Sequence, residues 1–146
     1  MNKRTKALDK EQYENIIATI RNGFEYDGHI FKPNNRLATM LVVQANIGVR
    51  ISDIIKLRLD DIVRENGRYH LDIVEQKTGK ERNFTVPAAL YEFLEKYAMD
   101  NKIQSTARLF PICERAVQKQ LKIVCDYLGV ESISTHSFRK FYATEI

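Results

Sequence analysis

The chain has 146 residues, a length that fits one folded domain and makes a second independent one unexpected. Its hydrophobic fraction of 44% and charged fraction of 29% are those of an ordinary globular protein, which excludes a disordered or fibrous chain. The net charge of +4 permits a polyanionic partner without requiring one. We find no signal peptide and no stretch as long as a membrane span, so we expect a cytoplasmic protein without membrane contact.

The N-terminal part begins with the pattern of an amphipathic helix. Asp9 and Gln12 match an N-cap residue and its reciprocal partner, and apolar residues then recur at helical spacing as far as Asn22. Residues 24–32 contain aspartate and glycine, and we predict a loop there.

Two more helices are predicted in close succession. The first opens at Pro33 and runs through Asn46, and Gly48 is placed to end it. A short helix over residues 51–57 follows almost at once. This arrangement leaves Arg50 in a tight corner between two helices.

Beyond these helices the hydrophobic period changes from that of a helix to that of a strand. Residues 69–74 and 83–86 alternate between apolar and polar, as in two strands with one buried face. Thr78 and Gly79 lie where the chain must reverse, which predicts a hairpin. Residues 62–63 are candidates for a third strand.

The remaining chain is predicted to be helical. One helix begins at Pro87 and ends near Met99, a second covers residues 114–128, and a last helix begins at His136 with a hydroxyl cap from the preceding residues, Ser134 or Thr135. The fold class is therefore α+β, mainly helical, with one small antiparallel sheet.

Cys113 and Cys125 are the only cysteines. They form no Cys-x-x-Cys pair, and no histidine stands at zinc-ligand spacing from them. We therefore predict buried, reduced thiols and no metal site.

The candidate site residues are two arginines and a histidine. A guanidinium is always charged and presents a planar fork of donors that matches two phosphate oxygens, so Arg50 and Arg139 together could clamp one phosphodiester. His136 is three positions before Arg139 and would share its helix face. Taken singly, an arginine at a surface corner and a histidine that contacts solvent are the more ordinary interpretations, because an isolated His-x-x-Arg is very common.

Basic residues also gather around the predicted hairpin turn. Lys77, Lys80 and Arg82 lie there, and Lys140 follows Arg139 in the last helix. A run of charge is usually only a solvated helix or strand face. For a DNA partner, the predicted contacts are Lys80, Arg82 and Lys140.

Three segments resemble motifs of the tyrosine recombinases, the phage integrase family. They are residues 45–57, 75–80 and 136–144. The resemblance covers nearly the whole chain from Leu8 onward and implies the catalytic-domain fold of that family, with its small three-stranded sheet. It also implies double-stranded DNA and other recombinase protomers as partners.

The resemblance implies a chemistry that needs no metal or other cofactor. In this family a tyrosine attacks a DNA phosphodiester, forms a 3′-phosphotyrosine link and frees a 5′-hydroxyl, and a second attack reseals the strand. Arg50 and Arg139 would stabilise the charge on the phosphate, Lys77 would give a proton to the leaving oxygen, and His136 would serve proton transfer and phosphate binding. Lys80 matches the lysine position less well. Asp53 matches a supporting acid, although an acid that merely stabilises a helix N-terminus has equal weight.

The nucleophilic tyrosine of the family stands downstream of the second arginine, after a histidine or tryptophan. Only seven residues follow Arg139, and Tyr142 is too close to attack a phosphate held by that arginine. We therefore expect residues 1–146 to be a partial catalytic domain without the nucleophile and without the family's N-terminal DNA-clamping domain, and so to be inactive alone.

The function expected from the resemblance is site-specific recombination or integration of a mobile DNA element. The alternatives are a DNA-binding or regulatory fragment with no chemistry of its own and, from the same mechanistic class, a type IB topoisomerase. We further predict that four residues converge on one basic cleft, because one phosphate must contact them all: Arg50, Lys77, His136 and Arg139.

Overall fold

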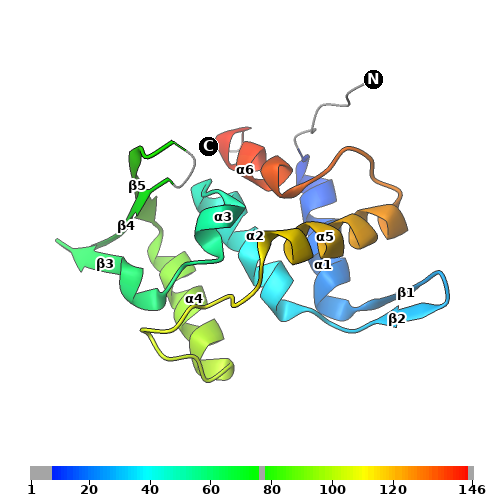
Figure 1. Ribbon diagram of the computed structural model, residues 1–146, viewed down its shortest axis with the longest axis horizontal. Coiled ribbons are helices and arrows are strands. Elements are labelled where there is room, and N and C mark those ends of the chain that lie inside the picture. Colours follow the sequence, from blue (N-terminus) through cyan, green and yellow to red (C-terminus); the bar gives the residue numbers. More distant parts are fainter. Residues whose placement is uncertain (1–7, 76–77, 145–146) are drawn as a thin grey trace. The chain divides into compact units, whose positions relative to one another are not determined.

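The computed structural model describes residues 8–75 and 78–144, and it confirms a mainly helical α+β fold with a small antiparallel sheet (Figure 1). Contacts between residues divide the chain into two compact units. We call residues 1–51 with 113–146 the helical unit and residues 52–112 the sheet unit.

The helical unit is built on four helices with a common apolar core. They are α1 (Lys10–Asn22), α2 (Asn35–Ile47), α5 (Glu114–Leu128) and α6 (Thr135–Thr144). Helix α6 packs on α2, and α1 contacts both α2 and α5. Tyr13 of α1 stacks on Phe141 of α6 with ring centroids 4.8 Å apart, and Phe138 is fully buried. Burial of these aromatic rings fixes which face of α6 points into the core.

The predicted start of α1 is confirmed. The Gln12 backbone N–H donates to Asp9 Oδ1 at 2.7 Å, and the Asp9 backbone N–H donates to Gln12 Oε1 at 3.2 Å. These two bonds satisfy donors that a helix otherwise leaves without intrahelical partners. The helix ends at Asn22, as predicted.

The loop predicted for residues 24–32 is wrong, because the segment forms a two-stranded hairpin. Strand β1 (Phe24–Tyr26) pairs antiparallel with β2 (His29–Phe31). The two turn residues, Asp27 and Gly28, both have positive φ, at 51° and 75°. Aspartate and glycine are favoured in such a turn because few other residues adopt both left-handed conformations. The signal was therefore present in the sequence.

Helix α2 begins two residues later than predicted. The Asn34 side chain caps the helix by accepting the Leu37 backbone N–H at 3.1 Å, so Pro33 lies before the cap. Helix α3 (Ile51–Ile54) is shorter than predicted. The Ile55 carbonyl accepts from Arg108 Nε at 2.7 Å instead of continuing the helical hydrogen bonding.

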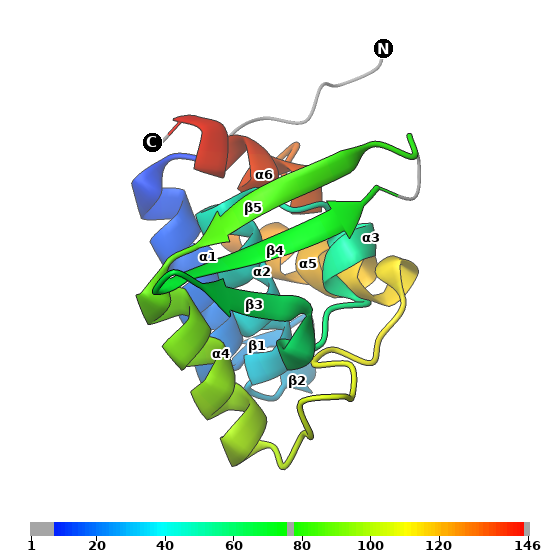
Figure 2. The ribbon, with the colours of Figure 1, turned by 90° about the vertical axis from the view of Figure 1, so that its left-hand side faces the viewer.

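The sheet unit contains the predicted three-stranded sheet, shown face-on in Figure 2 with the order β3–β4–β5. Strands β3 (Ile62–Glu65), β4 (Arg68–Val74) and β5 (Glu81–Val86) follow a single 3₁₀ turn, η1 (Leu59–Asp61). Leu71 pairs with Ile62 on one side and with Phe84 on the other, and all three side chains are buried. The alternating pattern in the sequence therefore gave the correct buried face.

Helix α4 (Ala88–Asp100) follows β5 directly and contacts β4 and η1. Its Tyr97 ring lies 5.4 Å from the ring of the fully buried Phe110, which closes the core of the sheet unit. No helix within the described residues is both long and apolar enough to cross a membrane.

The prediction of two buried thiols is correct for one cysteine only. Cys125 is buried in α5, and burial raises the pKa of its thiol to about 11. Cys113 is exposed because it precedes the first turn of α5, outside the apolar face of that helix.

Candidate functional site

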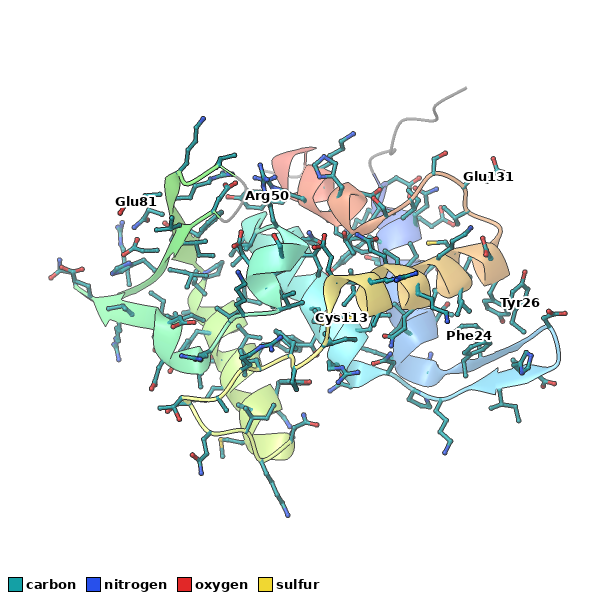
Figure 3. The ribbon with its side chains drawn as sticks, viewed as in Figure 1. Phe24, Tyr26, Arg50, Glu81, Cys113 and Glu131 are labelled. Atoms are coloured by element: carbon teal, nitrogen blue, oxygen red, sulfur yellow. The ribbon has the colours of Figure 1, made fainter. Side chains whose placement is uncertain are left out.

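The site is built around the corner where α2 ends. Gly48 adopts the left-handed conformation, with φ 70° and ψ 23°, and its N–H donates to the Gln44 carbonyl at 2.9 Å. Glycine is favoured here because a side chain is strained at positive φ. Val49 is buried, and Arg50, labelled in Figure 3, is half-buried and lies just before α3. The predicted corner position of Arg50 is therefore confirmed.

Helix α6 supplies two more residues of the predicted cluster, His136 and Arg139. Ser134 forms the predicted cap, since its hydroxyl accepts the His136 backbone N–H at 3.3 Å. Thr135 is buried and its hydroxyl instead accepts from Gln118 of α5 at 2.7 Å. The Phe138 side chain is buried in the core of the helical unit, whereas His136 is exposed and Arg139 is half-buried.

One hydrogen bond joins α6 to the corner. Arg139 Nε donates to the Gly48 carbonyl at 3.0 Å, across 91 positions of sequence. This carbonyl is at the C-terminal end of α2, where the helix dipole favours a cation. The bond uses one of the five N–H donors of the guanidinium, and the other four belong to its two terminal nitrogens. Arg139 is thus held against the peptide segment that carries Arg50.

Tyr142 lies against the same glycine. A Cβ atom placed on Gly48 would overlap the Tyr142 ring at Cδ1 and would lie only 2.9 Å from Cε1. Sequence reasoning excluded this tyrosine as the nucleophile and assigned it no other role. The available signal was its spacing, because Tyr142 is three positions after Arg139 and such residues share one helix face.

Asp53 is buried in α3, three positions after Arg50. An acid in the first turn of a helix lies where the helix dipole favours negative charge. Its supporting role in the site stays a prediction.

The hairpin residues belong to the sheet unit and are described separately. Lys77 lies outside the described residues. Lys80 is exposed just before β5, and its carbonyl accepts the Glu75 backbone N–H at 2.8 Å. The Gly79 N–H in turn donates to the Glu75 carbonyl at 2.8 Å. Glu75 therefore closes the base of the turn through both of its backbone groups.

Arg82 has a partner that the sequence did not indicate. Its Nη1 lies 3.0 Å from Glu75 Oε1, and the Glu75 side chain is only 5% exposed. The guanidinium also lies over the Phe84 ring, 5.0 Å from its centroid. Lys140, in α6, is half-buried. The predicted DNA contacts of Lys80, Arg82 and Lys140 stay predictions, and so does the convergence of all four catalytic candidates.

The arrangement can bind an anion. Arg50 and Arg139 lie at one corner, and His136 lies one helical turn before Arg139 on α6. Among the described residues, no group of three or more His, Cys, Asp or Glu side chains could hold a metal ion. Tyr13 is packed beneath α6, and burial raises its pKa, so this phenol is neutral at ordinary pH.

Comparison with known proteins is consistent across sequence and structure. The sequence profile of the phage integrase family matches residues 6–146. YoeC of Bacillus subtilis strain 168, a probable integrase/recombinase, is 27% identical over 123 residues, which are 81% of this chain and 66% of YoeC.

Two solved structures show the same fold. The XerH site-specific recombinase bound to palindromic difH substrate gives a TM-score of 0.67 at 19% identity, over 98% of this chain and 42% of that one. The Tn1549 transposon integrase in complex with circular intermediate DNA gives a TM-score of 0.69 at 15% identity, over 98% of this chain and 52% of that one. This chain spans less than two thirds of each of these relatives.

Proposed function

Because this chain belongs to the phage integrase family, we propose that it forms part of the catalytic domain of a site-specific recombinase, which breaks and rejoins double-stranded DNA. The observation that carries the proposal is the 3.0 Å bond from Arg139 Nε to the Gly48 carbonyl, which holds the second arginine at the corner of the first. The relatives named above include recombinases solved with DNA substrates. We place the reaction in the cytoplasm, with other recombinase protomers as partners.

The proposed mechanism gives each residue a distinct task. Arg50 and Arg139 stabilise negative charge on the non-bridging oxygens as the attacking oxygen approaches phosphorus. Lys77 gives a proton to the departing 5′ oxygen, and His136 assists proton transfer and phosphate binding. Asp53 supports the site from α3.

We assign the nucleophile to none of the seven tyrosines of this sequence. Tyr13 is packed in the helical core, and Tyr142 is only three positions after Arg139 on the same helix, too close to attack a phosphate held by that arginine. In the family the attacking tyrosine follows the second arginine. A polypeptide of residues 1–146 should therefore form no denaturant-resistant adduct with a DNA substrate that traps cleaved strands.

The resealing half of the reaction tests the proposal without that nucleophile. A DNA strand ending in a 3′-nitrophenyl phosphate carries an aryl leaving group like that of a phosphotyrosine link. In a duplex, a neighbouring 5′-hydroxyl attacks the phosphorus, the new phosphodiester forms, and the P–O bond to nitrophenol breaks. The hydroxyl proton passes to Lys77, in reverse of its role in cleavage.

We expect residues 1–146 to accelerate this joining at low salt and saturating protein, because phosphate contacts dominate binding without a known target sequence. The measurement is the rate of nitrophenolate release together with the amount of joined strand on a denaturing gel. If the chain binds DNA but the joining rate is no higher than in buffer alone, the catalytic assignment is rejected and a binding module is favoured. Failure to bind duplex DNA at low salt would reject both functions.

A further inference from the structure

Two residues of α6 contact Gly48 at different atoms. Arg139 donates to the glycine carbonyl, and the Tyr142 ring covers the place where a Cβ atom would stand. Both belong to the helical unit, and α6 packs along α2, the helix that Gly48 ends. The two side chains therefore act on the same peptide unit from one turn of one helix.

This contact constrains a residue that is otherwise easily moved. Glycine has the widest range of backbone conformations, so a glycine at φ 70° can rotate unless its surroundings prevent it. Rotation about Gly48 would turn its carbonyl away from Arg139 and change the direction in which the chain continues to Arg50. Positioning within a fraction of an ångström matters when two guanidinium groups must match one phosphate.

We infer that Tyr142 is a positioning residue, which keeps Arg50 and Arg139 aligned by packing its ring against Gly48. This inference rests on the proposed function, since it concerns the two arginines of that site. The contact is made by ring carbons, so the planar ring matters and the hydroxyl does not. Tyr142 acts through Gly48 and touches no reacting atom.

Three variants test the inference. Tyr142→Phe keeps the ring, and Tyr142→Leu removes it while keeping an apolar side chain. Tyr127→Leu is the matched control, because Tyr127 is a partly exposed tyrosine of the same unit whose ring contacts Phe24 and Tyr26 instead. Chemical denaturation of each variant identifies the conditions in which all three are folded.

The first readout is independent of catalysis. The side-chain Nε–H of Arg139 gives its own NMR signal, assigned by its loss in Arg139→Lys, and its hydrogen bond to Gly48 should slow exchange with water. We expect Tyr142→Phe and Tyr127→Leu to keep this slow exchange. We expect Tyr142→Leu to lose it, because the Gly48 carbonyl is no longer held in place.

The second readout is the joining reaction, measured at several DNA concentrations. Misalignment of the arginines should lower kcat of Tyr142→Leu by between about tenfold and a hundredfold. KM for DNA should change less than twofold, since Tyr142 acts through Gly48 and not by contacting DNA. Tyr142→Phe should keep the wild-type kcat because it keeps the ring. Tyr127→Leu, which also loses an aromatic ring from the same unit, should keep it too, an outcome that a general loss of packing does not predict.

The two readouts separate the possible failures. A normal kcat in folded Tyr142→Leu would overturn the inference, whether the Arg139 Nε–H exchanges slowly or rapidly with water in that variant. Absence of joining by the wild-type chain, with protection lost only in Tyr142→Leu, would reject the proposed function and still support the control of Arg139 by Tyr142.

Discussion

Arg139 in the helical unit and Arg82 in the sheet unit are both predicted to contact DNA, yet they are held in different ways. Arg139 bonds to a neutral backbone carbonyl, the one that ends α2. Arg82 bonds to the buried carboxylate of Glu75. The Gly48 carbonyl orients the guanidinium of Arg139 without neutralising its positive charge. The Glu75 carboxylate orients the guanidinium of Arg82 and also offsets its positive charge. Formal charge in a sequence therefore overstates the attraction of Arg82 for a phosphate.

The largest effect is expected from removing Arg139. Arg139→Ala should slow the joining reaction by about 3–4 kcal/mol of lost transition-state stabilisation, the scale of losing one preorganised donor. Arg82→Ala should slow it less than about tenfold, or about 1.4 kcal/mol, if Arg82 only assists DNA binding. Single-turnover joining rates at saturating DNA give this comparison. Equal decreases in rate in the two variants would show that the two arginines contribute equally to the reaction.

The corner can also be tested through its glycine. Gly48→Ala places a methyl group in a left-handed conformation and against the Tyr142 ring. The matched control is Gly129→Ala at the end of α5, because Gly129 has φ 70° and ψ 26° but no atom within 4 Å of an added Cβ. The backbone cost is the same, about 1–2 kcal/mol.

Gly48→Ala should therefore lower the free energy of unfolding by about 1–3 kcal/mol more than Gly129→Ala does, the usual cost of overpacking. Urea denaturation of the two variants measures the difference. Equal destabilisation would show that the Tyr142 ring moves aside easily, and that the corner is held by Arg139 alone.

The smallest effect concerns the salt dependence of DNA binding. Glu75→Gln removes the negative charge beside Arg82 while keeping an acceptor of the same shape, so Arg82 becomes available to a phosphate. The slope of log K against log salt should steepen by about 0.9 for one added phosphate contact.

Glu81→Gln provides the control for that measurement, because it raises the net charge equally at an exposed position of the same hairpin. Its slope should match the wild-type value within error. If both variants steepen the slope by the same amount, the effect is one of total charge and Arg82 makes no specific contact.

The parts of the fold that could be predicted depend on residues close together in sequence. The cap formed by Asp9 and Gln12 spans three positions, and two strands of the sheet were predicted from the alternation of residues 69–74 and 83–86. The β1–β2 hairpin was missed because its three-residue strands are too short for alternation to show, although Asp27-Gly28 is a turn signal.

The sequence indicated candidate site residues but not their contacts. Arg50 and Arg139 were selected by their motifs, but no local pattern reveals that Arg139 bonds to the Gly48 carbonyl, or that Tyr142 covers that glycine. The pairing of Glu75 with Arg82 depends on the register of the β4–β5 hairpin and on burial of the carboxylate. Such contacts follow from the packed structure.

The bond between Arg139 and Gly48 also has a consequence for the order of folding. It joins residues 91 positions apart, and contacts of high sequence separation carry a large loop-closure cost before they form. During synthesis the Arg50 corner leaves the ribosome long before α6 does. A nascent chain therefore holds one arginine of the pair without the other, and the proposed phosphate-binding pair is assembled only after the last helix has docked.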